Sequence, residues 1–184
     1  VSLKITSQPQ MVVAEKGTTA KITIGVTGEG LTYKWYFKNP GATKFSLTNT
    51  FKSNVYTISS MSAARDGRQV YCVITDKYGN SVKTNVITLH MGTPLKITAQ
   101  PESVTVAKGT KALVTVQAQG EGLTYKWYFK NPGASKFSLT TTFTSNSYFI
   151  NSMSASRSGR QVYCVITDKY GNTVTTDVVT LTVK

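Results

Sequence analysis

The sequence predicts an all-β protein built from two tandem antiparallel β-sandwiches of about 90 residues each. Residues that favour strands, chiefly Thr, Val and Tyr, are abundant along the whole chain. Apolar and polar residues alternate with a period of two over short runs. Shifting the chain by about 92 residues superimposes it on itself. With 40% apolar residues in a chain of 184, compact cores can form.

The internal repeat covers almost the whole chain. The runs GEGLTYKWYFKNPGA and GRQVYCVITDKYGN each occur twice without change, and LKITSQP returns as LKITAQP. About two thirds of the aligned positions are identical. We therefore divide the chain into residues 1–92 and 93–184. The junction HMGTP is short and contains Gly and Pro, which leaves both a stiff rod and a hinged pair open.

The strands of the first copy are predicted in chain order from this alternation. The runs that alternate are TTAKITIGV (18–26), LTYKWYFK (31–38) and QVYCVIT (69–75). Turn sequences separate them: TGEG, KNPGA, ARDG and KYGN each contain the glycine that tight turns favour. Short strands broken by turns about every ten residues indicate an antiparallel sandwich rather than a sheet with crossover helices. No segment shows a helical period.

The predicted core contains one Trp and one Cys per copy. Alternation places Trp35 and Cys72 on inward faces of their strands, and Trp127 and Cys164 likewise in the second copy. A Trp on the third strand, followed about 37 residues later by a core Cys on the sixth, is typical of immunoglobulin-type sandwiches. The inward half of each unaltered run is therefore explained by core packing.

On these residues the whole chain resembles two tandem bacterial immunoglobulin-like domains, of the kind repeated along large surface proteins of Gram-positive gut bacteria. The motifs that carry the resemblance are QP after the first strand, GEGLTYKWY, and a C followed by VITD and GN. The resemblance implies two immunoglobulin-like domains, 1–92 and 93–184, in an extracellular or cell-surface part of a larger secreted protein.

Two positions depart from the usual immunoglobulin pattern. Ile24 and Val116 stand where the second-strand Cys of the inter-sheet disulfide would be. Neither domain can form that bridge, so Cys72 and Cys164 are expected to be buried free thiols.

Catalysis and metal binding are not expected. The chain has a single histidine, His90, whose counterpart in the second copy is Thr182, so a Cys–His pair cannot be repeated. Its eight acidic residues form no cluster with the spacing of a calcium or zinc site. We expect neither an active site nor a cofactor. No run approaches the ~20 apolar residues that membrane insertion requires.

The outward half of the unaltered runs forms a candidate binding face, because core packing does not explain it. Exposed Tyr adds contact area at low entropic cost, and flanking Lys favours an anionic partner. Cross-strand pairing of Tyr36 with Tyr71 is the alternative explanation, which needs no ligand. The residues of this face are Lys34, Tyr36, Lys38, Tyr71, Lys77 and Tyr78, with Lys126, Tyr128, Lys130, Tyr163, Lys169 and Tyr170 in the second copy.

The net charge of +13 is shared almost equally by the two copies, with lysines scattered along the chain. Such a charge either maintains solubility or attracts polyanions. Three functions fit: an adhesive module for a host glycoprotein, an immunoglobulin or an anionic glycan; a spacer that presents another domain; and an electrostatic binder of an anionic cell-wall or host polymer. Nucleic acid is disfavoured, because no groove-recognition element accompanies the dispersed charge.

Overall fold

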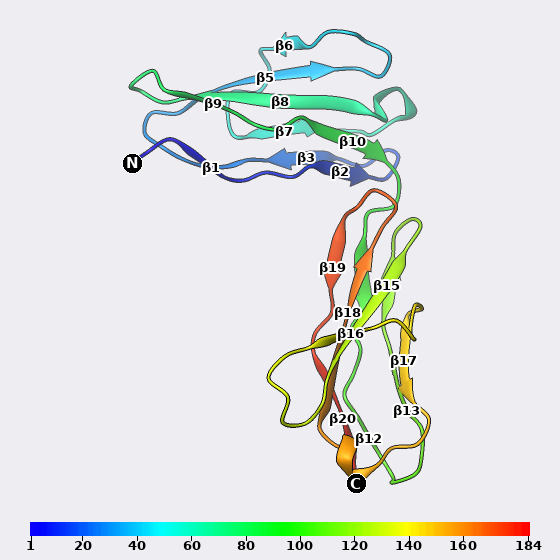
Figure 1. The fold of residues 1–184 in the computed structure, drawn as a ribbon. Helices are drawn as coiled ribbons and strands as arrows, with labels where there is room; N and C mark the ends of the chain where they lie inside the picture. Colours follow the sequence, from blue (N-terminus) through cyan, green and yellow to red (C-terminus); the bar gives the residue numbers. More distant parts are fainter. The chain divides into compact units, whose positions relative to one another are not determined.

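A computed structural model describes all residues, 1–184, and forms two compact units, Val1–Thr93 and Pro94–Lys184. The division falls one residue after the predicted boundary. Apart from one short 3-10 turn in each unit, η1 (Ala63–Arg65) and η2 (Ala155–Arg157), every regular element is a β-strand (Figure 1). No helix has the length and apolar character needed to cross a membrane.

The first unit has a small sheet region and a large sheet. In the small region β1 pairs β4 and β3 pairs β7, all antiparallel. Their bounds are β1 (Lys4–Ser7), β3 (Ala20–Thr23), β4 (Gly25–Thr27) and β7 (Val55–Ile58). The large sheet has the order β2-β10-β8-β5-β6, with β9 also paired to β8. Its strands are β2 (Met11–Ala14), β5 (Thr32–Lys38), β6 (Ser46–Thr48), β8 (Arg68–Thr75), β9 (Ser81–Lys83) and β10 (Ile87–Met91).

The second unit repeats this pairing strand for strand, with β11–β14 and β13–β17 in the small region and β12-β20-β18-β15-β16 plus β19 in the large sheet. Its bounds are β11 (Lys96–Ala99), β12 (Val104–Val106), β13 (Ala112–Thr115), β14 (Gln117–Gln119), β15 (Thr124–Lys130), β16 (Ser138–Thr140), β17 (Ser147–Ile150), β18 (Arg160–Thr167), β19 (Thr173–Thr175) and β20 (Val179–Val183).

The path of the first extended segment identifies the fold. β1 pairs in the small region, whereas β2, only a few residues later, joins the edge of the large sheet parallel to β10. Pro9 lies between the two strands, where a residue without a backbone N–H costs no ladder hydrogen bond. The first extended segment is thus shared between the two layers, and the order β10-β8-β5-β6 follows in the large sheet. This arrangement makes each unit an immunoglobulin-like sandwich, as the sequence predicts.

Each unit has its own core, centred on the predicted Trp and Cys. Trp35 lies directly opposite Cys72 across β5 and β8, and neither side chain has any exposed surface. The indole Nε1 donates to the carbonyl oxygen of Ser53 at 2.8 Å, which satisfies the one polar atom of the ring. Trp127 and Cys164 repeat this arrangement in the second unit.

Both thiols are free and buried, so the prediction of a sandwich without a disulfide is confirmed. Burial raises the pKa of Cys72 and of Cys164 to about 12. Ile24 and Val116, at the positions of the missing partner cysteines, are fully buried and fill the core with hydrocarbon instead. The thiols therefore act as small apolar side chains in the protonated form.

Candidate binding face

The outer face of the large sheet carries a pair of stacked tyrosines. Tyr36 on β5 lies opposite Tyr71 on β8, with ring centroids 4.8 Å apart and planes 11° from parallel. Tyr128 and Tyr163 stack in the same way in the second unit, at 4.9 Å and 6°. The cross-strand pairing considered from the sequence is therefore present. Each ring is half-buried and keeps part of its surface in contact with solvent.

Two apolar side chains that sequence reasoning missed extend this pair. Phe45 meets Tyr71 edge-on at 4.9 Å, and Leu47 on β6 lies opposite Tyr36 with 47% of its surface exposed. We call this group, Tyr36, Phe45, Leu47 and Tyr71, the aromatic cluster. Its counterpart is Tyr128, Phe137, Leu139 and Tyr163. The run KFSLT, identical in both copies, was the signal that could have found it.

Lysines surround the aromatic cluster. Lys38 Nζ lies 5.2 Å from the centre of the Phe45 ring, and Lys83 Nζ lies 4.0 Å from that of Tyr71. Lys34 is exposed on the same strand as Tyr36, opposite Val73. Ammonium groups over ring faces are attracted by the ring quadrupole.

The second unit repeats most of these lysines. Lys130 Nζ lies 5.1 Å from the centre of Phe137, and Lys126 is exposed on β15. Thr175 takes the place of Lys83. One cation at the edge of the cluster is therefore specific to the first unit.

Lys77 and Tyr78 do not join the aromatic cluster. Both contact Glu29 in the loop before β5: Lys77 Nζ lies 2.6 Å and the Tyr78 hydroxyl 3.2 Å from Glu29 Oε2. The Lys77 ammonium lowers the pKa of Glu29, and the carboxylate in turn raises the pKa of Lys77. Lys169 and Tyr170 contact Glu121 in the same way. The predicted face therefore separates into the cluster and a loop group at the end of the sandwich.

The loop group explains structurally why GEG and DKYGN are unaltered. The backbone N–H of Lys77 donates to the carbonyl of Glu29 at 2.9 Å. Gly30 has a φ of +60°, and a Cβ there would lie 2.8 Å from that of Lys77, so no other residue fits without movement. Asp76 Oδ1 accepts from the backbone N–H of both Tyr78 and Asn80 at 2.9 Å, which closes the turn.

The remaining candidates for chemistry are few. No group of three or more His, Cys, Asp or Glu side chains is placed to hold a metal ion. His90 Nδ1 lies 3.2 Å from Asp66 Oδ1, and the same carboxylate oxygen accepts from the backbone N–H of Met91. In the second unit Ser158 takes the place of Asp66, and its hydroxyl accepts from Val183 N–H. In both units, therefore, the residue that follows the 3-10 turn holds this turn to a strand of the large sheet, β10 in the first unit and β20 in the second.

Comparison with known proteins finds tandem immunoglobulin domains among solved structures. A structure described as the basis of Dscam isoform specificity covers all of this chain at 18% identity and a TM-score of 0.41. The structure of DIP-gamma IG1+IG2 covers all of this chain at 15% identity and a TM-score of 0.40. The structure of Drosophila OTK, extracellular domains 3-5, covers 98% of this chain at 15% identity and a TM-score of 0.42. The chain spans 47%, 98% and 65% of these three. No protein-family model and no curated protein sequence matches the chain.

Proposed function

We propose that the chain is a non-catalytic immunoglobulin-like tandem of an extracellular bacterial surface protein, and that each unit binds a host glycoprotein through its aromatic cluster. The observation that carries the proposal is the cluster itself. Two stacked tyrosines, a phenylalanine and an exposed leucine occupy the outer face of the large sheet, unaltered in both units. Packing inside the sandwich does not require any of these outward side chains.

The chemistry of the cluster suits a partner with apolar and anionic parts. Tyr and Phe supply contact area with few rotatable bonds, so little entropy is lost on binding. Lys38 stands beside the Phe45 ring, and Lys34 is exposed on the strand that carries Tyr36. Both would approach carboxylate or sulfate groups of a glycosylated surface. The net charge of +13 would speed encounter with such a partner.

A spacer without a ligand is the second candidate. The Tyr36–Tyr71 stack supports it, because an aromatic cross-strand pair stabilises a sheet by roughly 0.2–1 kcal/mol with no partner. Purely electrostatic binding to an anionic polymer is the third candidate, supported by the excess of scattered lysines.

One experiment separates the three. The chain, and a variant carrying Tyr36→Ala, Tyr71→Ala, Tyr128→Ala and Tyr163→Ala, are tested on a glycan array and in a serum pull-down at ~50 and ~200 mM salt. The proposal expects binding that survives the higher salt and that the variant loses. Tyr78→Ala with Tyr170→Ala is the matched control, because these rings lie outside the cluster.

Binding that disappears at the higher salt, with or without the tyrosines, would support the electrostatic function instead. No binding at either salt would leave the spacer. A thermal melt of each variant shows that lost binding does not come from unfolding.

A further inference from the structure

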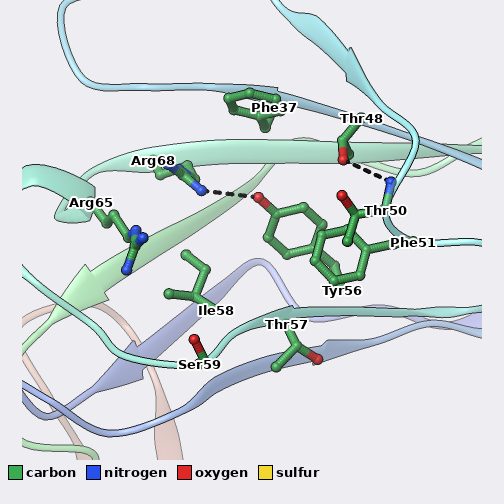
Figure 2. A pocket seen from close by; sticks show the side chains of 10 residues that line it. All are labelled: Phe37, Thr48, Thr50, Phe51, Tyr56, Thr57, Ile58, Ser59, Arg65 and Arg68. Carbon is green, nitrogen blue, oxygen red and sulfur yellow. Dashed lines mark hydrogen bonds between the residues drawn. The ribbon is translucent and has the colours of Figure 1, made fainter.

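The chain has four arginines, and all of them line one of two equivalent pockets. The pocket of the first unit contains Arg65 and Arg68, and that of the second unit contains Arg157 and Arg160. In the first unit the pocket has a volume of about 260 Å³ and opens where β6 of the large sheet approaches β7 of the small region (Figure 2). Arg65 reaches it from η1 and Arg68 from the start of β8. This pocket lies at the edge of the sandwich and contains no residue of the aromatic cluster.

Arg68 is held in place by its neighbours. Its Nη1 donates to the Tyr56 hydroxyl at 3.2 Å and its Nε to Asn39 Oδ1 at 2.8 Å. Its guanidinium lies over the ring of Phe37, 5.1 Å from the ring centre. These contacts fix the guanidinium plane before any ligand arrives, so binding would cost little side-chain entropy.

Neither arginine is neutralised by a carboxylate. The side chain of Arg65 makes one hydrogen bond, from Nη1 to the carbonyl of Ser60 at 2.6 Å, and it lines the pocket. No salt bridge in the protein involves an arginine. Asp66, next in sequence to Arg65, is already engaged by His90 and Met91.

The second pocket is similar and has an unsatisfied donor. Arg160 Nη1 donates to the Tyr148 hydroxyl at 3.1 Å, while its Nε is buried without a partner. The equivalent Nε of Arg68 donates to Asn39 Oδ1 in the first unit, so in the second unit this donor is open to another acceptor. Ser158 replaces Asp66 here, which removes the one carboxylate adjacent to Arg157. This pocket has a volume of about 370 Å³.

The rest of the lining is aromatic and hydroxylic. Phe51 and Tyr56 form an apolar floor, with ring centroids 4.4 Å apart. Thr50 and Ser59 place hydroxyl groups around the rim (Figure 2). An apolar platform with hydroxyls and two guanidinium groups matches a sugar ring that bears an acidic group, because guanidinium binds carboxylate and sulfate with paired N–H donors.

We propose that each arginine pocket binds one acidic sugar unit, with its carboxylate or sulfate on the arginine pair and its ring against the aromatic floor. This inference does not depend on the aromatic cluster, which faces outward from a different part of the sandwich.

The test is an NMR titration of the full chain, labelled with ¹⁵N, with glucuronic acid, N-acetylglucosamine 6-sulfate, and the neutral sugars glucose and N-acetylglucosamine. The proposal expects shifts of the arginine side-chain N–H and of the Tyr56 and Tyr148 amides with at least one acidic sugar. Comparing the carboxylated with the sulfated probe shows which acid is preferred. Equal shifts with the neutral sugars, or shifts confined to Tyr36 and Tyr71, would overturn it.

Variants provide the second arm. Arg65→Lys with Arg157→Lys keeps the charge but removes the paired donors, and should weaken binding of the acidic sugar at least tenfold. The matched control is Lys16→Met with Lys108→Met, which lowers the net charge by two outside the pockets and should leave the affinity within about twofold. Equal loss in both variants would mean that only bulk charge attracts the sugar, and would contradict the proposal.

Discussion

The two outer faces of the sandwich have diverged to different degrees between the units. On the small sheet region, Lys21 pairs across β3 and β7 with Thr57 in the first unit. The same positions hold Leu113 and Phe149 in the second, with Leu113 46% exposed. On the large sheet the aromatic cluster is identical in both. The fold therefore accepts either a polar or an apolar pair at outward positions, and does not by itself dictate the cluster.

The large sheet also differs between the units outside the aromatic cluster. Lys83, whose ammonium lies over Tyr71, becomes Thr175. The His90–Asp66 contact becomes Thr182 and Ser158. Substitution is thus tolerated right beside the cluster while its centre stays constant. The comparison predicts equal responses to changes in the shared parts and unequal responses to changes in the parts that differ.

The largest and most symmetric effect is expected in the cores. Trp35→Ala should destabilise the first unit by about 3–5 kcal/mol, enough to unfold it while the second unit stays folded, because each core is built from its own residues. Trp127→Ala should do the reverse to the same extent. Two-dimensional NMR of each variant counts the folded units. Loss of both units from one substitution would show that the cores are coupled.

A smaller effect is expected at acid pH in the turn after β8. Hydrogen bonding by Asn80 lowers the pKa of Asp76 in the folded state. Its contribution to stability is therefore fully present above its unfolded pKa of about 3.9 and is lost as pH falls through the lower folded value. Asp76→Asn should flatten the decline in stability of the first unit between about pH 5 and pH 2.

Urea denaturation at several pH values measures this effect. Glu15→Gln is the control, since Glu15 is exposed and its side chain forms no hydrogen bond. An acid decline as steep in Asp76→Asn as in the unaltered chain would rule out the turn as its source.

The smallest effect on stability is expected at the position beside the aromatic cluster that holds Lys83 in the first unit and Thr175 in the second. Lys83→Thr should lower the stability of the first unit by about 0.5–1 kcal/mol, the value of an exposed cation over an aromatic ring. Thr175→Lys should stabilise the second unit by a similar amount, because Tyr163 lies at the same place on β18. Denaturation midpoints check both changes. A shift of the same sign in the two reciprocal variants would contradict the cation–ring account.

The sequence predicts the inward and outward faces of β5 and β8 because strand alternation is a local property. Trp35 is buried and Tyr36 lies outside, as a period of two requires. Phe45 could not be found this way, since it follows a turn at 39–44 that has no period. The separation of Lys77 and Tyr78 from the cluster depends on Glu29, whose position beside the turn follows only from the fold.

The arginine pockets were equally hidden from the sequence. Arg65 and Arg68 lie close together in the chain, but the floor of their pocket comes from Phe51 and Tyr56. These four residues meet only because strands far apart in the sequence pair with one another, which no local pattern predicts. From the sequence, the run ARDGR predicts only a turn. Counting residue types points to them, because the chain has arginine only in this run and in its counterpart SRSGR, at Arg157 and Arg160.

The most direct test of the proposed function compares matched double variants of the full chain against whichever glycoprotein the serum pull-down retains. Because the clusters are identical, Tyr36→Ala with Tyr71→Ala should weaken binding by the same factor as Tyr128→Ala with Tyr163→Ala, with thermal stability changed by no more than the loss of one stacked pair. Unchanged affinity in both double variants, or loss in only one, would contradict a binding role for the repeated cluster.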